Sequence, residues 1–91
     1  MIITRNVVAE KLIDFLQHRL SLADMVNWAE AAIMEEEFDE HNYHTLRDIV
    51  SRLGLADVKA FGLSWTDCED FLSRLGYRIS VLVSDQSAVA A

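Results

Sequence analysis

The stretch Ser64–Gly76, SWTDCEDFLSRLG in one-letter code, contains a complete set of helix signals. Ser64 and Asp67 have the spacing of a capping box, in which the side chain of each residue accepts a hydrogen bond from the backbone N–H of the other. Leu63 is placed to pack against the first turn, and Gly76 supplies the stop. The apolar residues in between recur with helical period: Cys68, Phe71, Leu72 and Leu75. We therefore predict an amphipathic helix here.

Two helices are predicted near the start of the chain. The first covers residues 7–19, with Thr4 or Asn6 as its N-cap. The second opens at Ser21, with Asp24 at the capping-box position three residues later. Their apolar faces consist of Val8, Leu12, Phe15 and Leu16 in the first helix, and of Leu22, Met25, Val26, Ala29 and Ile33 in the second.

A third helix is predicted in the middle of the chain. It begins after Asp39 or Asn42, and Gly54 is expected to end it in a left-handed conformation. A short helical turn over Ala56–Phe61, closed by Gly62, should lead into the helix at residue 64. The apolar face of the third helix consists of Leu46, Ile49, Val50 and Leu53.

Two of these helix ends share one pattern, at residues 48–55 and 70–77. Both read Asp, two apolar residues, Ser, Arg, Leu, Gly and a further apolar residue. Arginine favours the last turn of a helix and glycine favours the stop, so shared end chemistry explains the likeness. An ancient duplication is the alternative.

The segment Tyr77–Val83 has a different period. Tyr77, Ile79, Val81 and Val83 alternate with Arg78, Ser80 and Leu82, which is typical of a strand. A lone strand leaves its backbone groups unpaired, so it needs a partner. Met1–Thr4, the other extended β-branched stretch, is the preferred partner, and the same segment of a second chain is the alternative.

Composition bounds the class of protein. The chain has 91 residues, 52% of them hydrophobic, with a net charge of −7, no proline and one cysteine. Together with the predicted helices and strand pattern, this composition predicts a mainly α protein, a compact bundle of four to five helices with one short C-terminal β-strand. Residues 1–83 should form a single helical domain, and residues 84–91 a frayed tail.

Charge and cysteine content also restrict the function. The acidic balance disfavours binding to nucleic acid. No apolar run approaches the length of a membrane span, and no signal peptide is evident, so we expect a cytoplasmic protein without membrane contact. The single cysteine, Cys68, excludes an internal disulfide and a cysteine-rich zinc site.

The segment Glu35–Glu40, EEEFDE, is the densest run of like charge and the candidate partner-binding site. Its first residues follow the end of a predicted helix, where the macrodipole disfavours negative charge. Such breaches of a local rule are enriched at functional sites. We expect this acidic segment to face solvent and to contact a basic protein through Glu35, Glu36, Glu37, Asp39 and Glu40.

A metal site is an alternative use of the same region. If its backbone is helical, Glu37 lies one turn from His41, and Glu40 one turn from His44, a spacing that can hold a divalent cation. No second motif elsewhere completes a di-metal set, and no EF-hand loop is present. A solvated acidic linker is the simpler interpretation, so no metal or other cofactor is expected.

No catalytic residues are predicted. Cys68 lies on an apolar helix face, where cysteine acts as a small hydrophobic residue, and the sequence has no phosphate-binding loop and no nucleophile elbow. Trp28 and Trp65 are expected in the core, with interface anchors as the alternative. We expect a protein that is not an enzyme.

The residues Leu12–Leu16, Ser21–Met25 and Trp28 resemble the opening helical hairpin of bacteriocin-immunity proteins of the colicin D type. The resemblance covers about the first third of the chain, and it implies an acidic helical bundle that neutralises a basic nuclease. The leading hypothesis is therefore an acidic module that binds a basic protein, immunity-like or antitoxin-like. The alternatives are a structural homo-oligomer, at its simplest a homodimer, joined through the C-terminal strand, and a metal-binding protein using Glu37, Glu40, His41 and His44.

Overall fold

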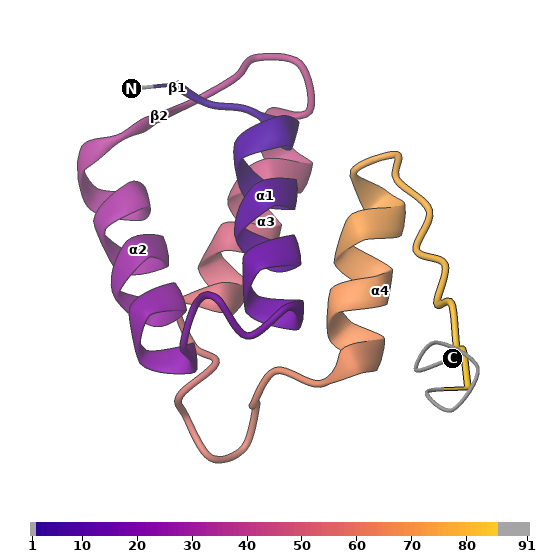
Figure 1. Cartoon of the computed structure of the whole chain (residues 1–91). Coiled ribbons are helices and arrows are strands. Elements are labelled where there is room, and N and C mark those ends of the chain that lie inside the picture. The colour runs from indigo at the N-terminus through magenta and orange to yellow at the C-terminus, as the bar shows by residue number, and fades with distance from the viewer. Residues whose placement is uncertain (1, 86–91) are drawn as a thin grey trace.

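A computed structural model describes residues 2–85 of the chain, which form four helices and one pair of very short strands (Figure 1). In chain order these elements are β1 (Ile2–Ile3), α1 (Arg5–Leu16), α2 (Leu22–Glu35), β2 (Glu37–Phe38), α3 (Tyr43–Leu53) and α4 (Trp65–Arg74). The prediction of a mainly α fold is confirmed. No helix among residues 2–85 combines the length and the apolar character needed to cross a bilayer.

A predicted N-cap residue begins each of the four helices, and in three of them its side chain makes the capping hydrogen bond. The hydroxyl of Thr4 accepts a hydrogen bond from the N–H of Val7, and that of Ser21 accepts one from the N–H of Asp24. The capping box of Ser64 and Asp67 is complete, with distances of 3.1 and 2.9 Å. Each cap satisfies backbone donors that a helix start would otherwise leave without a partner.

The helix ends agree with the predictions less well. Gly76 ends α4 with φ of +92°, and the N–H of Tyr77 donates to the carbonyl of Leu72, as in a Schellman motif. Gly54, predicted to be left-handed, has φ of −66°. The chain continues from it through successive turns to Gly62, where φ reaches +64°, so the predicted helical turn at 56–61 is not a helix. The buried side chain of Ala56 holds these turns against the bundle.

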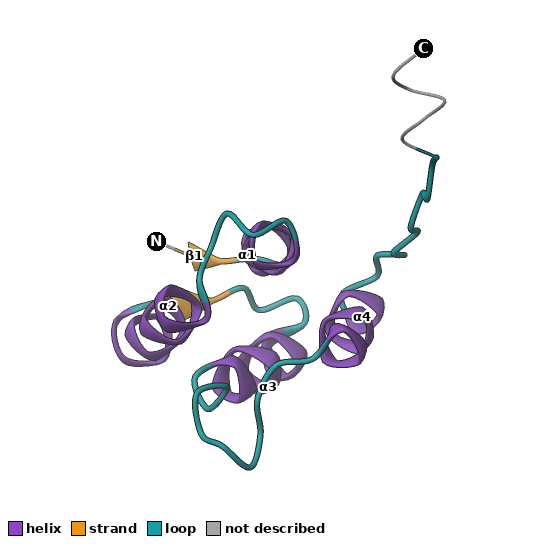
Figure 2. Cartoon of the chain, turned by 60° about the horizontal axis from the view of Figure 1, so that its bottom comes forward, coloured by secondary structure: helices purple, strands orange, loops and turns teal. Residues whose placement is uncertain are grey.

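The core lies between the helices, where α2 packs against α3, and α1 contacts both of them and α4 (Figure 2). Trp28 packs against this core as expected, but Trp65 is 47% exposed, which corrects the prediction that both tryptophans are buried. Trp65 is the first residue of α4, and the buried face of that helix begins three residues later, at Cys68. The largest fully buried side chains are Ile3, Leu12, Met25, Leu46, Ile49, Leu53, Val8, Val50 and Cys68.

The two strands pair in parallel, with Ile2 opposite Glu37 and Ile3 opposite Phe38. The predicted pairing of a C-terminal strand with Met1–Thr4 is therefore wrong, because Ile2 and Ile3 pair with β2 and residues 77–83 form no strand within the described residues 2–85. Pairing with a second chain stays a prediction. Ile3 and Phe38 are both buried, so the observed pairing brings two apolar side chains into the core. Of the predicted tail, Ser84 and Asp85 are exposed outside any regular element, and residues 86–91 lie outside the described part of the chain.

Candidate protein-binding surface

The acidic segment Glu35–Glu40 passes through three kinds of local structure at the corner between α2 and α3. Glu35 is the last residue of α2, and Glu36 follows as its C-cap with an extended backbone, φ −110° and ψ 161°. Glu37 and Phe38 form β2, which runs parallel to β1 and beside it at the top of Figure 1. A turn then leads into α3. The helix therefore ends before most of the negative charge is reached.

Strand alternation decides which acidic side chains face outward. Phe38 is buried in the core, so its neighbour Glu37 points away from the bundle. Glu35, Glu37 and Glu40 are exposed, whereas Glu36 and Asp39 are half-buried. The expectation that the whole segment faces solvent is therefore met by three of its five carboxylates.

Asp39 stabilises the turn that begins after β2. Its backbone N–H donates to the carbonyl of Ile3 at 2.9 Å and extends the pairing of the two strands. Its carboxylate accepts the N–H of His41 at 3.1 Å, and Oδ1 also lies 3.5 Å from Nδ1 of the same residue. Asn42 follows with φ of 71° and occupies the N-cap position of α3 without a side-chain hydrogen bond. Asp39 therefore has a structural role in the turn between β2 and α3.

Exposed apolar side chains flank the acidic segment. Met34, one residue before it, is 83% exposed, and Ile2 lies opposite Glu37 in the strand pair with its side chain also exposed. Tyr43 is partly exposed at the start of α3, and its ring meets that of Phe38 edge to face, 6.1 Å between centroids. Methionine and tyrosine are enriched at protein interfaces, and the carboxylates around them could form the polar rim that surrounds such a contact.

The geometry required for the metal alternative is absent. The helical register assumed for Glu37 with His41, and for Glu40 with His44, does not exist, because Glu37 lies in β2 and residues 39–42 form a turn. Only His44 of the four lies in a helix. Within the described residues 2–85, no three histidine, cysteine or acidic side chains come together as a metal site requires.

Cys68 has the environment of an unreactive thiol. Its side chain is fully buried, and burial, reinforced by the charge of Asp67, raises its pKa to about 11. Because the thiolate is the reactive form, such a cysteine is a poor nucleophile at neutral pH.

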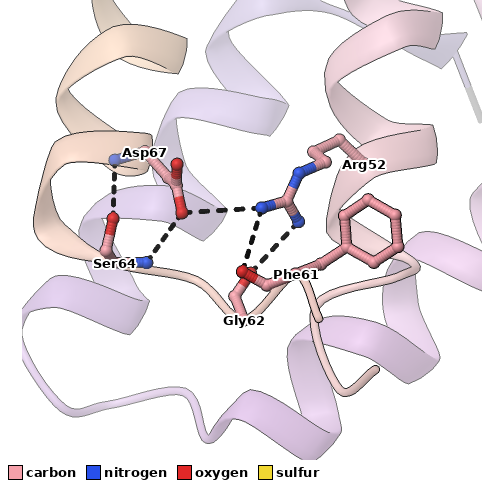
Figure 3. A network of polar contacts seen from close by, with 5 residues as sticks. All are labelled: Arg52, Phe61, Gly62, Ser64 and Asp67. Carbon is pink, nitrogen blue, oxygen red and sulfur yellow. Dashed lines mark hydrogen bonds and ion pairs between the residues drawn. The ribbon is translucent and has the colours of Figure 1, made fainter. Parts of the chain in front are cut away.

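A network around Arg52, which the sequence did not suggest, joins α3, the loop and the start of α4 (Figure 3). The guanidinium donates to the carbonyls of Gly62 and Phe61 at 3.1 and 3.3 Å, and it lies 3.6 Å from the carboxylate of Asp67. It also lies over the ring of Phe61. The backbone N–H of Ser64 is the main cause of the lowered pKa of Asp67, with smaller contributions from the Ser64 hydroxyl and from Arg52. The network is structural and lies apart from the acidic segment.

Comparisons with protein-family models, with curated proteins and with solved structures found no match to this chain.

Proposed function

We propose that this protein is an acidic interaction module that binds a basic protein partner stoichiometrically, in the manner of an immunity protein or an antitoxin, and that it catalyses no reaction. The binding surface consists of Glu35, Glu37 and Glu40 with the neighbouring Met34 and Tyr43. The observation that carries the proposal is the outward orientation of three carboxylates on a backbone that β1 pairing and the buried Phe38 hold in place.

Electrostatics supports a basic partner. The net charge of −7 attracts positively charged proteins over a distance, and clustered carboxylates concentrate that attraction at one corner. Glu35 adds its charge to the negative end of the α2 macrodipole, which strengthens the field there. Surface charges of this kind raise the association rate and contribute little to folding.

The apolar neighbours support a specific contact beyond charge attraction. Met34 is flexible and can adapt to a partner's surface, and Tyr43 offers a ring held by its edge-to-face contact with Phe38. The proposal includes a cytoplasmic location, where the buried Cys68 stays reduced, and it requires no cofactor.

The test is a triple variant that neutralises the surface: Glu35→Gln, Glu37→Gln and Glu40→Gln. Tagged wild-type protein and the variant are used to capture proteins from cells of the source organism at low and high salt. The expected result is a basic protein that the wild type captures at low salt and the variant does not. Purified, it should associate with the variant at least tenfold more slowly at low salt, with the difference reduced at high salt.

A matched control distinguishes the effect of these three carboxylates from the effect of a lower net charge on the whole protein. Glu10, Glu30 and Glu69 are also exposed, and each lies on a different helix, so replacing all three with glutamine makes the same change in net charge elsewhere. The control variant should retain most of the association rate. Equal binding by both triple variants, or capture of proteins without basic character, would contradict the proposal.

A further inference from the structure

After α4 the chain leaves the bundle with an apolar segment, residues 81–83, whose side chains are largely exposed. Val81, Leu82 and Val83 are 64, 93 and 86% exposed, whereas most of the other large apolar side chains among residues 2–85 are buried or half-buried. No backbone hydrogen bond joins residues 78–84 to the rest of the described chain, residues 2–85. Figure 2 shows the segment running away from the bundle.

The base of this segment is held firmly. Arg5 donates to the carbonyl of Leu75 at 3.0 Å, and its guanidinium lies 4.8 Å from the centre of the Tyr77 ring. The hydroxyl of Tyr77 donates to the side-chain carbonyl of Asn6. Ile79 makes the last contact with the core, half-buried beside it. These contacts set the direction in which residues 80–84 leave the bundle.

Alternating β-branched residues whose backbone groups pair with no other described residue have the features of a strand that needs a neighbour. The N-terminal stretch of the same chain cannot supply it on its paired side, because Ile2 and Ile3 already pair with Glu37 and Phe38. We infer that residues 79–83 pair antiparallel with the same residues of a second copy of this chain, giving a symmetric homodimer. This inference is independent of the proposed binding of a basic protein.

Charge and hydrophobic pattern select this arrangement. Residues 79–84 carry no charge, so two copies of a −7 chain can approach here without bringing like charges together. Arg78 precedes the segment and Asp85 follows it, so antiparallel strands bring opposite charges toward each other, whereas parallel strands align like charges.

The register follows from the apolar residues. With Val81 at the two-fold axis, Ile79 lies opposite Val83 of the second copy, and Val81 lies opposite itself. All five residues from 79 to 83 are then matched without a charged residue among them. A shift toward the C-terminus would place Ile79 opposite Asp85, which the pairing of apolar side chains disfavours.

The first test is the mass in solution by sedimentation over a wide dilution series. The wild type should show twice the chain mass of 10.3 kDa and dissociate on dilution. Val81→Lys should be monomeric throughout, whereas Met34→Lys, the same change at another highly exposed residue, should dimerise like the wild type. A wild type that is monomeric at all concentrations, or a dimer that persists in Val81→Lys, overturns the inference.

The second test checks the register by disulfide formation in a Cys68→Ala background. Val81→Cys should cross-link two copies under mild oxidation, because residues opposite each other lie within disulfide reach. Val83→Cys should not, because the two copies of residue 83 would lie about 13 Å apart along the strands, at four residues of ~3.3 Å each. Equal cross-linking at both positions overturns the register.

Discussion

The backbone of His18 has a left-handed conformation, with φ of 62°, which residues other than glycine adopt rarely. It allows α1 to end after Leu16, because the N–H of Arg19 donates to the carbonyl of Asp14 at 2.8 Å and the N–H of His18 donates to that of Phe15. The same bonding pattern ends α4, where Gly76 holds the left-handed position.

We predict that His18→Gly stabilises the protein. Glycine relieves a left-handed cost of about 1–2 kcal/mol but loses more chain entropy on folding, so the net gain should be on the order of 0.5–1 kcal/mol. His18→Val should lower stability, because β-branched residues tolerate this conformation poorly. Urea unfolding of the three proteins measures both effects, and a less stable glycine variant would contradict the argument.

The thiol of Cys68 should make stability depend on pH in the alkaline range. Its pKa rises from 9.0 to about 11 on folding, so between these values the unfolded chain has lost the proton while the folded chain retains it. Stability therefore falls as pH rises through this window, by at most about 1.4 kcal/mol per pH unit.

The measurement is urea unfolding between pH 8 and about 11, for the wild type and Cys68→Ala. The alanine variant should lose on the order of 1 kcal/mol at neutral pH and lack the thiol's share of the alkaline decline. Because other groups titrate here, the difference between the two proteins is the informative quantity. Parallel pH profiles, or thiol labelling as fast in the folded as in the denatured protein, would show that Cys68 is accessible.

At the scale of elements, one sequence pattern gives two different helix ends. The pattern at residues 48–55 places Gly54 in a right-handed conformation, whereas the pattern at 70–77 places Gly76 in a left-handed one. Their arginines also differ. Arg52 contacts two loop carbonyls and Asp67, whereas Arg74 makes one ion pair, at 2.7 Å, with the exposed Asp48. The surroundings of each helix end decide how similar residues are used.

These two arginines provide a matched prediction. Arg52→Met should cost about 1.5–3 kcal/mol, because it removes charge-assisted hydrogen bonds to carbonyls that hold the loop. Arg74→Met should cost less than about 1 kcal/mol, since exposed ion pairs contribute little. Hydrogen exchange should quicken over residues 54–62 in the first variant only. Equal losses in the two variants would show that the Arg52 network does not anchor the loop.

At the scale of the whole molecule, acidic side chains outnumber the basic side chains that could pair with them. The chain has 15 acidic and 8 basic residues. Within residues 2–85, five of the basic residues make ring contacts or ion pairs: Arg5 and Lys11 lie over aromatic rings, and Arg19, Arg52 and Arg74 form ion pairs. The exposed carboxylates of the acidic segment therefore add to a general self-repulsion that disfavours the compact state.

We predict that neutralising Glu35, Glu37 and Glu40 with glutamine leaves the fold intact and slightly raises the melting temperature at low salt. Added salt should stabilise the wild type by screening repulsion, and it should stabilise the triple variant less. Melting curves at several salt concentrations measure both effects. A triple variant that unfolds would show that these carboxylates are structural, which their exposure argues against.

The sequence by itself determined the mainly helical class, the capped starts at Ser21 and Ser64, and the apolar face of each helix, and it gave Thr4 as one of two candidate caps for the first helix. These features depend on residues within one or two turns of each other, so local chemistry is sufficient to predict them. It also located the acidic segment, because a run of charge is visible in any chain. The metal-site alternative assumed that Glu37 and His41 lie one helical turn apart. This assumption was wrong, because Glu37 and Phe38 form a strand that pairs with β1.

Only the tertiary structure decided which distant segments meet. Ile3 pairs beside Phe38, Arg52 contacts Asp67, and Arg5 holds Tyr77, and in each case the partners are separated by many residues. Strand pairing in particular cannot be inferred from alternation alone, because residues 77–83 have a strand pattern and pair with no strand among residues 2–85. Two-residue strands carry almost no periodic signal, and the burial of Ile3 and Phe38 in a shared core is what selects their pairing.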